Sequence, residues 1–373
     1  MVSLIDELAG EIGPRPAGSH ASERAASAVA DALAATGLEP SFQEFDLLGY
    51  EPAEPRLEVD DEAWPAAPCL YSQPTPAGGV EGQLRHLGTN IVLRGLFEPV
   101  AFAVEAGGRE VARLYGNPLG GGAVPFSSGY GPTISGPAAY VSTADAVRLR
   151  EREGARVRLE TFGRFVPGLR ERNVLALLPG ESEKTVIVSA HFDTAWRSPG
   201  AVDNASGVEA LRRIAETLQG RRLRRSVLFA AFGAEELGLL GSRFFAFEAR
   251  LRCELDRIAA VVNLDCVASG ERLELKASPA SLRERALARA GALGLTDRYV
   301  VEAKPSGPGT DDHSFWLEQV PALALVFWTY PEYHLHTDLP ELVDAARLDD
   351  ATALALALVE ELAEDGCPRG GAP

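Results

Sequence analysis

Three short motifs in this chain place acidic or histidine side chains beside an apolar run or a predicted helix. They are His191-Phe192-Asp193, Asp203-Asn204 and Glu235-Glu236. Side chains alternate along a strand, so His191 and Asp193 point to one side and the Asp193 carboxylate can orient the imidazole. Adjacent glutamates point in different directions, so one can bind a metal while the other faces a reacting water. The three motifs together predict a metal site with its own general base.

Two further motifs lie downstream in the same setting. Asn263-Leu264-Asp265 follows the apolar residues 258–262, and Tyr333-His334 follows the apolar residues 323–328 within a few positions. In open α/β sheets, ligands bind beyond the carboxyl ends of parallel strands, so we expect these residues to gather there. His191 alone would favour a hydrogen-bonded core histidine, and the glutamates alone a solvated loop. The combination reverses both interpretations, because unpaired carboxylates are costly in apolar surroundings.

Strand-like and helix-like segments alternate from residue 173 onward. We expect strands at 173–178, 185–190, 226–232, 258–264, 297–302 and 322–328, and helices at 205–219, 280–292 and 345–363. This alternation is typical of an α/β fold with a doubly wound, mostly parallel sheet.

The first part of the chain has the sequence pattern of helices. Leu4, Leu8 and Ile12 have the spacing of one helix face, and Ser19 can cap a second helix from about His20 to Ala35.

The middle of the chain contains short extended stretches such as residues 90–93, many Gly and Pro residues, and a glycine run at 120–122 that we interpret as a plain loop. We therefore predict an N-terminal helical part of the main domain at 1–46, an inserted β-rich domain at 47–168, and the main α/β domain at 169–373.

Composition limits the partners. The 373 residues carry 36 Lys and Arg against 53 Asp and Glu, a formal net charge of −17, which argues against nucleic acid or an anionic membrane as a partner and favours a cationic group on the substrate. The four cysteines have no CxxC spacing and are too few for a disulfide framework, so we expect free thiols. No signal peptide or membrane-spanning run is recognisable, so the expected location is the cytoplasm.

The motifs together resemble peptidase family M28, the zinc peptidases of the co-catalytic aminopeptidase group. The resemblance is carried by Ser189-Ala190-His191-Phe192-Asp193, Gly200-Ala201-Val202-Asp203-Asn204-Ala205-Ser206-Gly207, the segment 232–242 around Glu235-Glu236, Asn263-Leu264-Asp265, Asp312-His313 and Tyr333-His334. These motifs follow one another in the family's order. Gly13-Pro14-Arg15 is similar to the family's N-terminal segment, and residues 136–142 are similar to an inserted protease-associated domain.

The resemblance implies two zinc ions per chain and a role for each matching residue. Asp203 would bridge the ions, with a cis peptide bond after it. His191 and Asp265 would bind one ion, and Glu236 and His334 the other. Glu235 would be the general base, Asp193 would orient His191, and Tyr333 would stabilise the developing oxyanion. His334 is preferred to His336 because it stands four residues before Asp338, as in the family.

The implied activity is that of an aminopeptidase acting on peptides with a free N-terminus. Two divalent ions can share a bridging hydroxide and polarise the scissile carbonyl, while the base takes a proton from the water and passes it to the leaving amine. Imidazole and carboxylate ligands favour zinc, although manganese or cobalt also suits an oxygen-rich site. The preferred N-terminal residue and the oligomeric state are not encoded in any motif.

Two other functions stay open at this point. A glutaminyl-cyclase-like transferase with a single zinc ion has a similar fold, and Asp311-Asp312-His313 favours it, whereas the segment 203–207 favours the peptidases. We expect His313 beside the site or anchoring a loop, without binding a metal. A receptor-like homologue without turnover is the non-enzymatic alternative, and the intact Glu235 argues against it.

Overall fold

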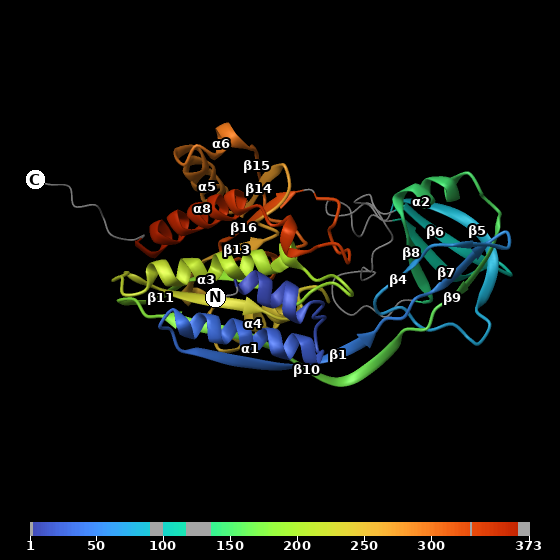
Figure 1. Ribbon diagram of the computed structural model, residues 1–373, viewed down its shortest axis with the longest axis horizontal. Coiled ribbons are helices and arrows are strands. Elements are labelled where there is room, and N and C mark those ends of the chain that lie inside the picture. Colours follow the sequence, from blue (N-terminus) through green and yellow to red (C-terminus); the bar gives the residue numbers. More distant parts are fainter. Residues whose placement is uncertain (1–2, 90–99, 117–135, 329, 365–373) are drawn as a thin grey trace, which may run out of the picture. The chain divides into compact units, whose positions relative to one another are not determined.

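The computed structural model describes residues 3–89, 100–116, 136–328 and 330–364. It divides into two compact units, one formed by Met1–Phe45 with Arg170–Pro373 and the other by Asp46–Leu169. Figure 1 shows the first as a sheet between helices and the second as a mostly β-structure. The stretch at 90–93 and the glycine run at 120–122 lie outside the described residues.

The first unit is built on an eight-stranded sheet in the order β1-β10-β12-β11-β13-β16-β14-β15. The strands are β1 (Pro40–Glu51), β10 (Arg164–Leu178), β11 (Ser182–His191), β12 (Arg225–Phe232), β13 (Ile258–Asp265), β14 (Arg272–Ser278), β15 (Val300–Lys304) and β16 (Ala322–Trp328). The four central strands β12, β11, β13 and β16 are parallel to one another, whereas β10 and β14 pair antiparallel with their inner neighbours. The sheet is therefore mostly parallel at its centre, as expected.

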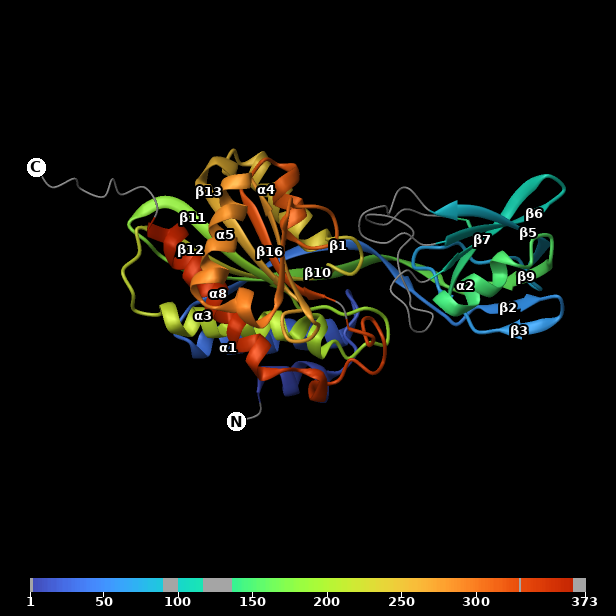
Figure 2. The same cartoon turned by 90° about the horizontal axis from the view of Figure 1, so that it is seen from above.

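Helices cover both faces of this sheet (Figures 1 and 2). The helices of one face are α1 (His20–Ala35), α3 (Ser206–Leu218), α5 (Ala280–Ala292) and α8 (Ala345–Glu364), and those of the other are α4 (Leu240–Leu251) and α7 (Asp312–Leu317). Along β11, Val186 and Val188 belong to the core under the first set and Ile187 to the core under the second. Alternate residues of one strand thus fill two cores, which is why the central strands are continuously apolar.

The expected elements of this unit are largely present. The helix predicted from His20 to Ala35 has these ends, and Ser19 caps it by accepting a hydrogen bond from the Ser22 N–H at 3.1 Å. The segment before it forms a short π-type helix, η1 (Asp6–Ile12). The strand predicted at 297–302 is wrong at its start, because residues 295–298 form the short helix α6 (Leu295–Arg298) and β15 begins at Val300. The sequence did not predict β14, α4 and α7, nor the edge strand β1, which begins at Pro40 inside the part expected to be helical.

The second unit contains an eight-stranded sheet of its own, in the order β3-β2-β9-β5-β6-β7-β8-β4. Its elements are β2 (Arg56–Val59), β3 (Glu62–Trp64), β4 (Ala67–Pro68), β5 (Val80–Thr89), β6 (Val100–Ala106), β7 (Arg109–Gly116), β8 (Ala138–Val141), α2 (Thr143–Arg150) and β9 (Arg156–Glu160). Among the residues of this unit that the structure describes, all strand pairings are antiparallel except that of β7 with β8. A core that includes Phe102, Leu114 and Leu159 lies on one face, so this unit buries its own apolar surface.

Within the described part of the chain, Cys69, Cys253 and Cys266 are free thiols, as predicted. None of the helices described in the structure is both long enough and apolar enough to span a lipid bilayer.

Candidate metal centre

The four parallel central strands deliver the predicted site residues to one edge of the sheet. His191 is the last residue of β11 and Asp265 the last residue of β13. Glu235 and Glu236 follow the end of β12, and His334 follows β16. The carboxyl ends of parallel neighbours lie at the same edge, so residues far apart in sequence converge there.

Two groups of ligand-type side chains form at this edge, and they share Asp203. The first contains His191, Asp203 and Asp265, and the second contains Asp203, Glu236 and His334. His191 Nε2 lies 3.1 Å from Asp203 Oδ1, and His334 Nε2 lies 3.2 Å from Asp203 Oδ2. Each oxygen of one carboxylate therefore faces a different histidine, which is the arrangement of a carboxylate that bridges two cations.

The spacing of these atoms fits zinc. Two ligands that each lie about 2.0 to 2.1 Å from a tetrahedral ion are separated by about 3.3 Å. Besides the two distances to Asp203, His191 Nε2 lies 3.5 Å from Asp265 Oδ1, and His334 Nε2 lies 3.1 Å from Glu236 Oε2. Each group supplies three protein ligands, which leaves positions open as in catalytic zinc sites.

Asp193 organises the site in two ways. Its carboxylate accepts the backbone N–H groups of Glu235 at 3.0 Å and Glu236 at 3.2 Å, which fixes the glutamate pair relative to His191. The hydrogen bond of His191 Nδ1 is made to the Asp193 backbone carbonyl at 3.2 Å, while the carboxylate oxygen lies 3.6 Å away. Asp193 therefore lies against His191 with both its main-chain carbonyl and its carboxylate.

The carboxylates around His191 and His334 stabilise positive charge at this site. Burial lowers the pKa of His334, but Glu236 and Asp203 outweigh it and raise that pKa to about 10. Burial also opposes protonation of His191, yet the surrounding carboxylates raise its pKa well above the ordinary value. Bound cations would supply this charge and leave both imidazoles neutral, the form in which histidine binds metals.

Glu235 has a different environment from its neighbour. Desolvation raises the pKa of Glu235 well above its ordinary value, and the carboxylates of Glu236, Asp265 and Asp311 add to this, although His191 opposes it. Glu236 Oε1 accepts the Ala195 N–H at 3.0 Å while its Oε2 faces His334. The two adjacent glutamates therefore have separate surroundings, and only Glu236 belongs to a ligand group.

The Asp203 turn is held at both sides. Asp338 accepts the backbone N–H groups of Val202 at 2.9 Å and Asp203 at 3.1 Å. The Asn204 amide donates to the Leu264 carbonyl at 2.9 Å and accepts the Cys266 N–H at 3.3 Å, so it is hydrogen-bonded to the backbone on both sides of Asp265, at the end of β13. These contacts present Asp203 to both ligand groups. The Asp203–Asn204 peptide bond is cis, as predicted.

The remaining predicted residues are also placed by the structure. The Tyr333 ring stacks on the His334 ring with 3.8 Å between centroids and is half-buried. His336 is exposed and belongs to neither ligand group. His313 lies outside both groups too, stacked on Trp316 at 5.2 Å. His334, the last ligand in sequence, has a left-handed backbone with φ of 61°.

Sequence reasoning assigned no role to several residues of this centre. Arg15 is fully buried and donates to the Phe192 carbonyl beside His191. Asp311 is fully buried, and its carboxylate contributes to the raised pKa of Glu235. Asp338 was noted only for its spacing from His334. Gly13-Pro14-Arg15 was recognised as a motif, which was the available signal for Arg15, whereas the burial of Asp311 and Asp338 depends on packing.

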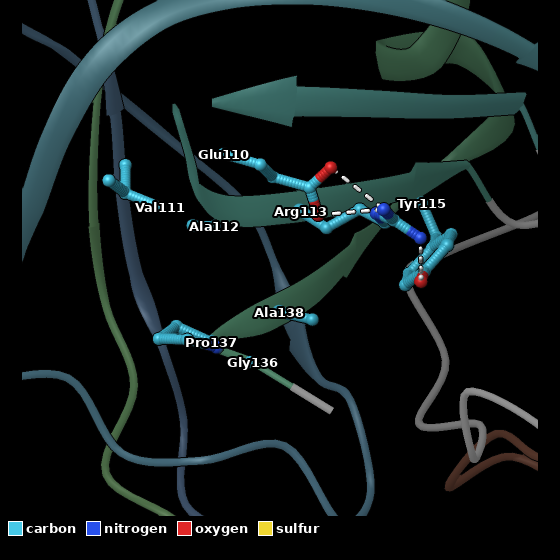
Figure 3. Close-up of a pocket in the computed structure, with 8 residues that line it drawn as sticks. All are labelled: Glu110, Val111, Ala112, Arg113, Tyr115, Gly136, Pro137 and Ala138. Atoms are coloured by element: carbon cyan, nitrogen blue, oxygen red, sulfur yellow. Dashed lines mark hydrogen bonds and ion pairs between the residues drawn. The ribbon is translucent and has the colours of Figure 1, made fainter. Parts of the chain in front are cut away.

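A separate pocket lies in the second unit (Figure 3). It has a volume of about 240 Å³ and is lined by Glu110, Val111, Ala112, Arg113, Tyr115, Gly136, Pro137 and Ala138. Arg113 Nη2 donates to Glu110 Oε2 at 2.7 Å, so its charge is already paired. The described lining residues include no histidine or cysteine, and they form no ligand group comparable with the two above.

The chain is similar to known proteins over much of its length. A model of the family described as Peptidase family M28 matches residues 173–359, which include all the predicted metal and catalytic residues. Aminopeptidase YwaD from Bacillus subtilis (strain 168) is 26% identical over 397 residues, which cover 96% of this chain and 83% of that protein.

Solved structures share the fold over nearly the whole chain. BSAP, a zinc aminopeptidase from Bacillus subtilis, superimposes with a TM-score of 0.74 at 22% identity, covering 97% of this chain and 94% of its own. A glutaminyl cyclase from Fimbriiglobus ruber superimposes with a TM-score of 0.56 at 15% identity, covering 96% of this chain and 92% of its own. At these identities the solved structures show only that the α/β fold is shared. The reaction must be inferred from the residues of the metal centre.

Proposed function

This chain belongs to peptidase family M28, a family of zinc peptidases, and we propose that it is an aminopeptidase that binds two zinc ions and removes N-terminal residues from peptides. The observation that carries the proposal is the pair of ligand groups that share Asp203, each oxygen of which faces a different histidine. An aminopeptidase relative that covers 96% of the chain supports the substrate class.

The ligand groups define which residues would hold each ion. His191, Asp203 and Asp265 would hold one, and Asp203, Glu236 and His334 the other. When bound, such a pair of zinc ions supplies Lewis acidity, which polarises the scissile carbonyl and makes a water a good nucleophile at neutral pH.

Glu235 is the proposed general base. It lies beside both ligand groups without belonging to either, and Asp193 holds its backbone N–H. Desolvation raises the pKa of its carboxyl, which makes it a stronger base than an exposed glutamate, while cations bound nearby would oppose the rise. In the reaction it takes the proton of the attacking water and then gives it to the leaving amine.

One further feature suits the hydrolysis of a peptide bond. Tyr333 lies against His334, and partial burial beside Asp203 and Glu236 raises the pKa of its hydroxyl well above the ordinary value. The hydroxyl therefore stays protonated and can donate a hydrogen bond to the oxyanion. We also propose that the unit Asp46–Leu169 corresponds to a protease-associated domain.

The rival function is that of a single-zinc glutaminyl-cyclase-like transferase. The fold alone permits it, and the buried Asp311 of Asp311-Asp312-His313 favours it. Against it stands the complete first ligand group, in which Asp203 Oδ1 lies 3.1 Å and Asp265 Oδ1 lies 3.5 Å from His191 Nε2. A single-zinc enzyme needs only one such group.

The test is a panel of aminoacyl chromogenic substrates assayed with the zinc-loaded protein, with the chelated protein, and with N-acetylated forms of the same substrates. We expect release of the chromophore only from substrates with a free α-amine, loss of activity on chelation, and two zinc ions per chain by elemental analysis. A single zinc ion together with cyclisation of N-terminal glutamine would establish the rival, and two ions without hydrolysis would contradict the aminopeptidase assignment.

A further inference from the structure

Arg15 is a fully buried arginine beside the metal centre. Its guanidinium donates to five backbone carbonyls. The acceptors are Phe192 O at 2.6 Å from Nε, Leu8 O at 3.1 Å, Gly13 O at 3.2 Å and Pro199 O at 2.5 Å from Nη1, and Gly200 O at 2.9 Å from Nη2. Its backbone N–H also donates to Thr194 Oγ1 at 3.0 Å, and its carbonyl accepts the Thr194 N–H at 3.4 Å. One residue of the N-terminal segment thus contacts both ends of the segment 192–200.

The segment 192–200 connects two of the ligands. It begins directly after His191 and ends three residues before Asp203. Its Ala195 N–H also holds Glu236 Oε1 at 3.0 Å. Its end is tightly packed, because a Cβ at Gly200 would lie 2.3 Å from the Asp203 carbonyl oxygen. A change in the conformation of the segment 192–200 would therefore move His191 and Asp203 relative to each other, and Glu236 with them.

We propose that Arg15 is a positioning residue that sets the separation of His191 and Asp203, and hence the zinc affinity of the centre, by binding the carbonyls at both ends of the segment 192–200. The inference rests on the proposed metal site and names a residue outside its ligands. No ligand group contains Arg15, and it lies more than 170 positions from His191 in sequence.

The chemistry of the contacts explains why arginine stands at this position. A guanidinium carries five N–H donors in a rigid plane, whereas lysine has three on one flexible nitrogen and cannot reach carbonyls spread around that plane. Desolvation lowers the pKa of Arg15 to about 10, with Asp193 and Asp338 opposing, so the group stays charged at neutral pH. Its removal would leave buried carbonyls without donors, and the segment would have to rearrange to satisfy them.

The experiment measures zinc affinity directly in the full chain. The variants are Arg15→Lys, which keeps the charge, Thr194→Val, which keeps the shape but removes the hydroxyl that accepts the Arg15 N–H, and Arg24→Lys, an exposed control on α1. The dissociation constant of each zinc ion is obtained by competition with a chromophoric chelator. The thermal unfolding of the metal-free proteins and the absorption spectra of their cobalt forms are recorded in parallel.

We expect Arg15→Lys to weaken at least one zinc ion by about 10- to 100-fold, the usual effect of losing a residue that orients metal ligands. The cobalt spectrum should change with it, and Arg24→Lys should match the original protein. A folded Arg15→Lys variant with unchanged zinc affinities would overturn the inference, even if its metal-free form unfolds at a lower temperature, since that would be a structural role alone. If Arg15→Lys does not fold, weaker zinc binding by Thr194→Val supports the inference and unchanged binding overturns it. An original protein that binds no zinc would instead refute the proposed function.

Discussion

At the scale of single residues, the adjacent glutamates separate metal binding from proton transfer. Glu236 faces His334 at 3.1 Å within a ligand group, whereas Glu235 belongs to neither group and its carboxyl is desolvated. The backbone N–H groups of both are held by Asp193, so a substitution in one side chain leaves the other anchored.

The first prediction follows from this separation. Glu235→Gln should retain both zinc ions and bind substrate with little change, but lose about 10²- to 10⁴-fold in kcat, because glutamine keeps the size yet cannot accept a proton. Glu236→Ala should release one ion. Elemental analysis and steady-state kinetics on the two variants check both statements. Near-normal turnover by Glu235→Gln, or the loss of a metal from it, would refute the role given to this residue.

The second prediction concerns the two histidines after β16. His334 is buried with its Nε2 between Asp203 and Glu236, whereas His336 is exposed and outside both ligand groups. We expect His334→Ala to lose a zinc ion and activity, and His336→Ala to keep two ions and near-normal kcat/KM. A metal-content assay that gave the reverse pattern would show that the chain binds its second ion differently.

At the scale of elements, close contact between the start of α3 and the end of β13 brings Asp203 and Asp265 together. Gly207 lies at this contact, where a Cβ would be 2.3 Å from Asn204 Oδ1 and 2.4 Å from the Leu264 carbonyl oxygen. Its N–H also donates to Asn204 Oδ1 at 2.9 Å. The absence of a side chain at this position therefore lets the Asp203–Asn204 turn lie against the strand that carries Asp265.

The third prediction tests this contact. Gly207→Ala should lower the free energy of unfolding by about 1 to 3 kcal/mol, the usual cost of overpacking, and should reduce zinc affinity because α3 is pushed from β13. Gly291→Ala is the matched control, since Gly291 is an exposed residue of α5 where an added Cβ would meet no neighbouring heavy atom within 4 Å, and it should stabilise the helix by about 0.5 to 1 kcal/mol. Denaturant unfolding and chelator competition measure the two effects. If the two variants had the same unfolding free energy and the same zinc affinity, Gly207 would not be needed for the contact between α3 and β13.

At the scale of the whole molecule, the two compact units differ in what holds them together. Every residue of both ligand groups belongs to the unit formed by Met1–Phe45 and Arg170–Pro373. The unit Asp46–Leu169 has its own sheet and its own apolar cores. Any metal held by these groups would therefore lie within that one unit.

The fourth prediction uses this difference. A ligand that binds only the folded state stabilises it by about 2.7 kcal/mol at a free concentration one hundred times its dissociation constant. Chelation should therefore lower the unfolding temperature of the unit formed by Met1–Phe45 and Arg170–Pro373, and zinc should restore it. The unfolding temperature of the unit Asp46–Leu169 should not change. Differential scanning calorimetry of the full chain measures both. A chelator that shifts both transitions equally, or neither, would contradict this assignment of the metal centre to one unit.

The sequence by itself determined the elements that have a strong local pattern. The helix His20–Ala35 has the predicted ends because its apolar spacing and the Ser19 cap are local signals. The central strands were recognisable because they are apolar on both faces, and the order of the motifs placed ligand-type residues at their carboxyl ends. Strand β14 was missed because Glu274 and Lys276 are charged, yet both are buried in the sheet, where Lys304 pairs with Glu274 at 2.6 Å.

Only the tertiary structure decided which atoms meet. The motifs could not show that Asp203 directs one oxygen to each histidine, that the backbone of Asp193 contacts His191 while its carboxylate holds the glutamate pair, or that Arg15 joins the two ends of the segment 192–200. Apart from the local contact between Asp193 and His191, these contacts link residues that lie 12 to more than 170 positions apart in the sequence. Their lengths depend on strand register and on the packing of α3 against the sheet. Local sequence pattern specifies which face a side chain occupies, whereas distances between side chains of different elements arise only when the elements pack.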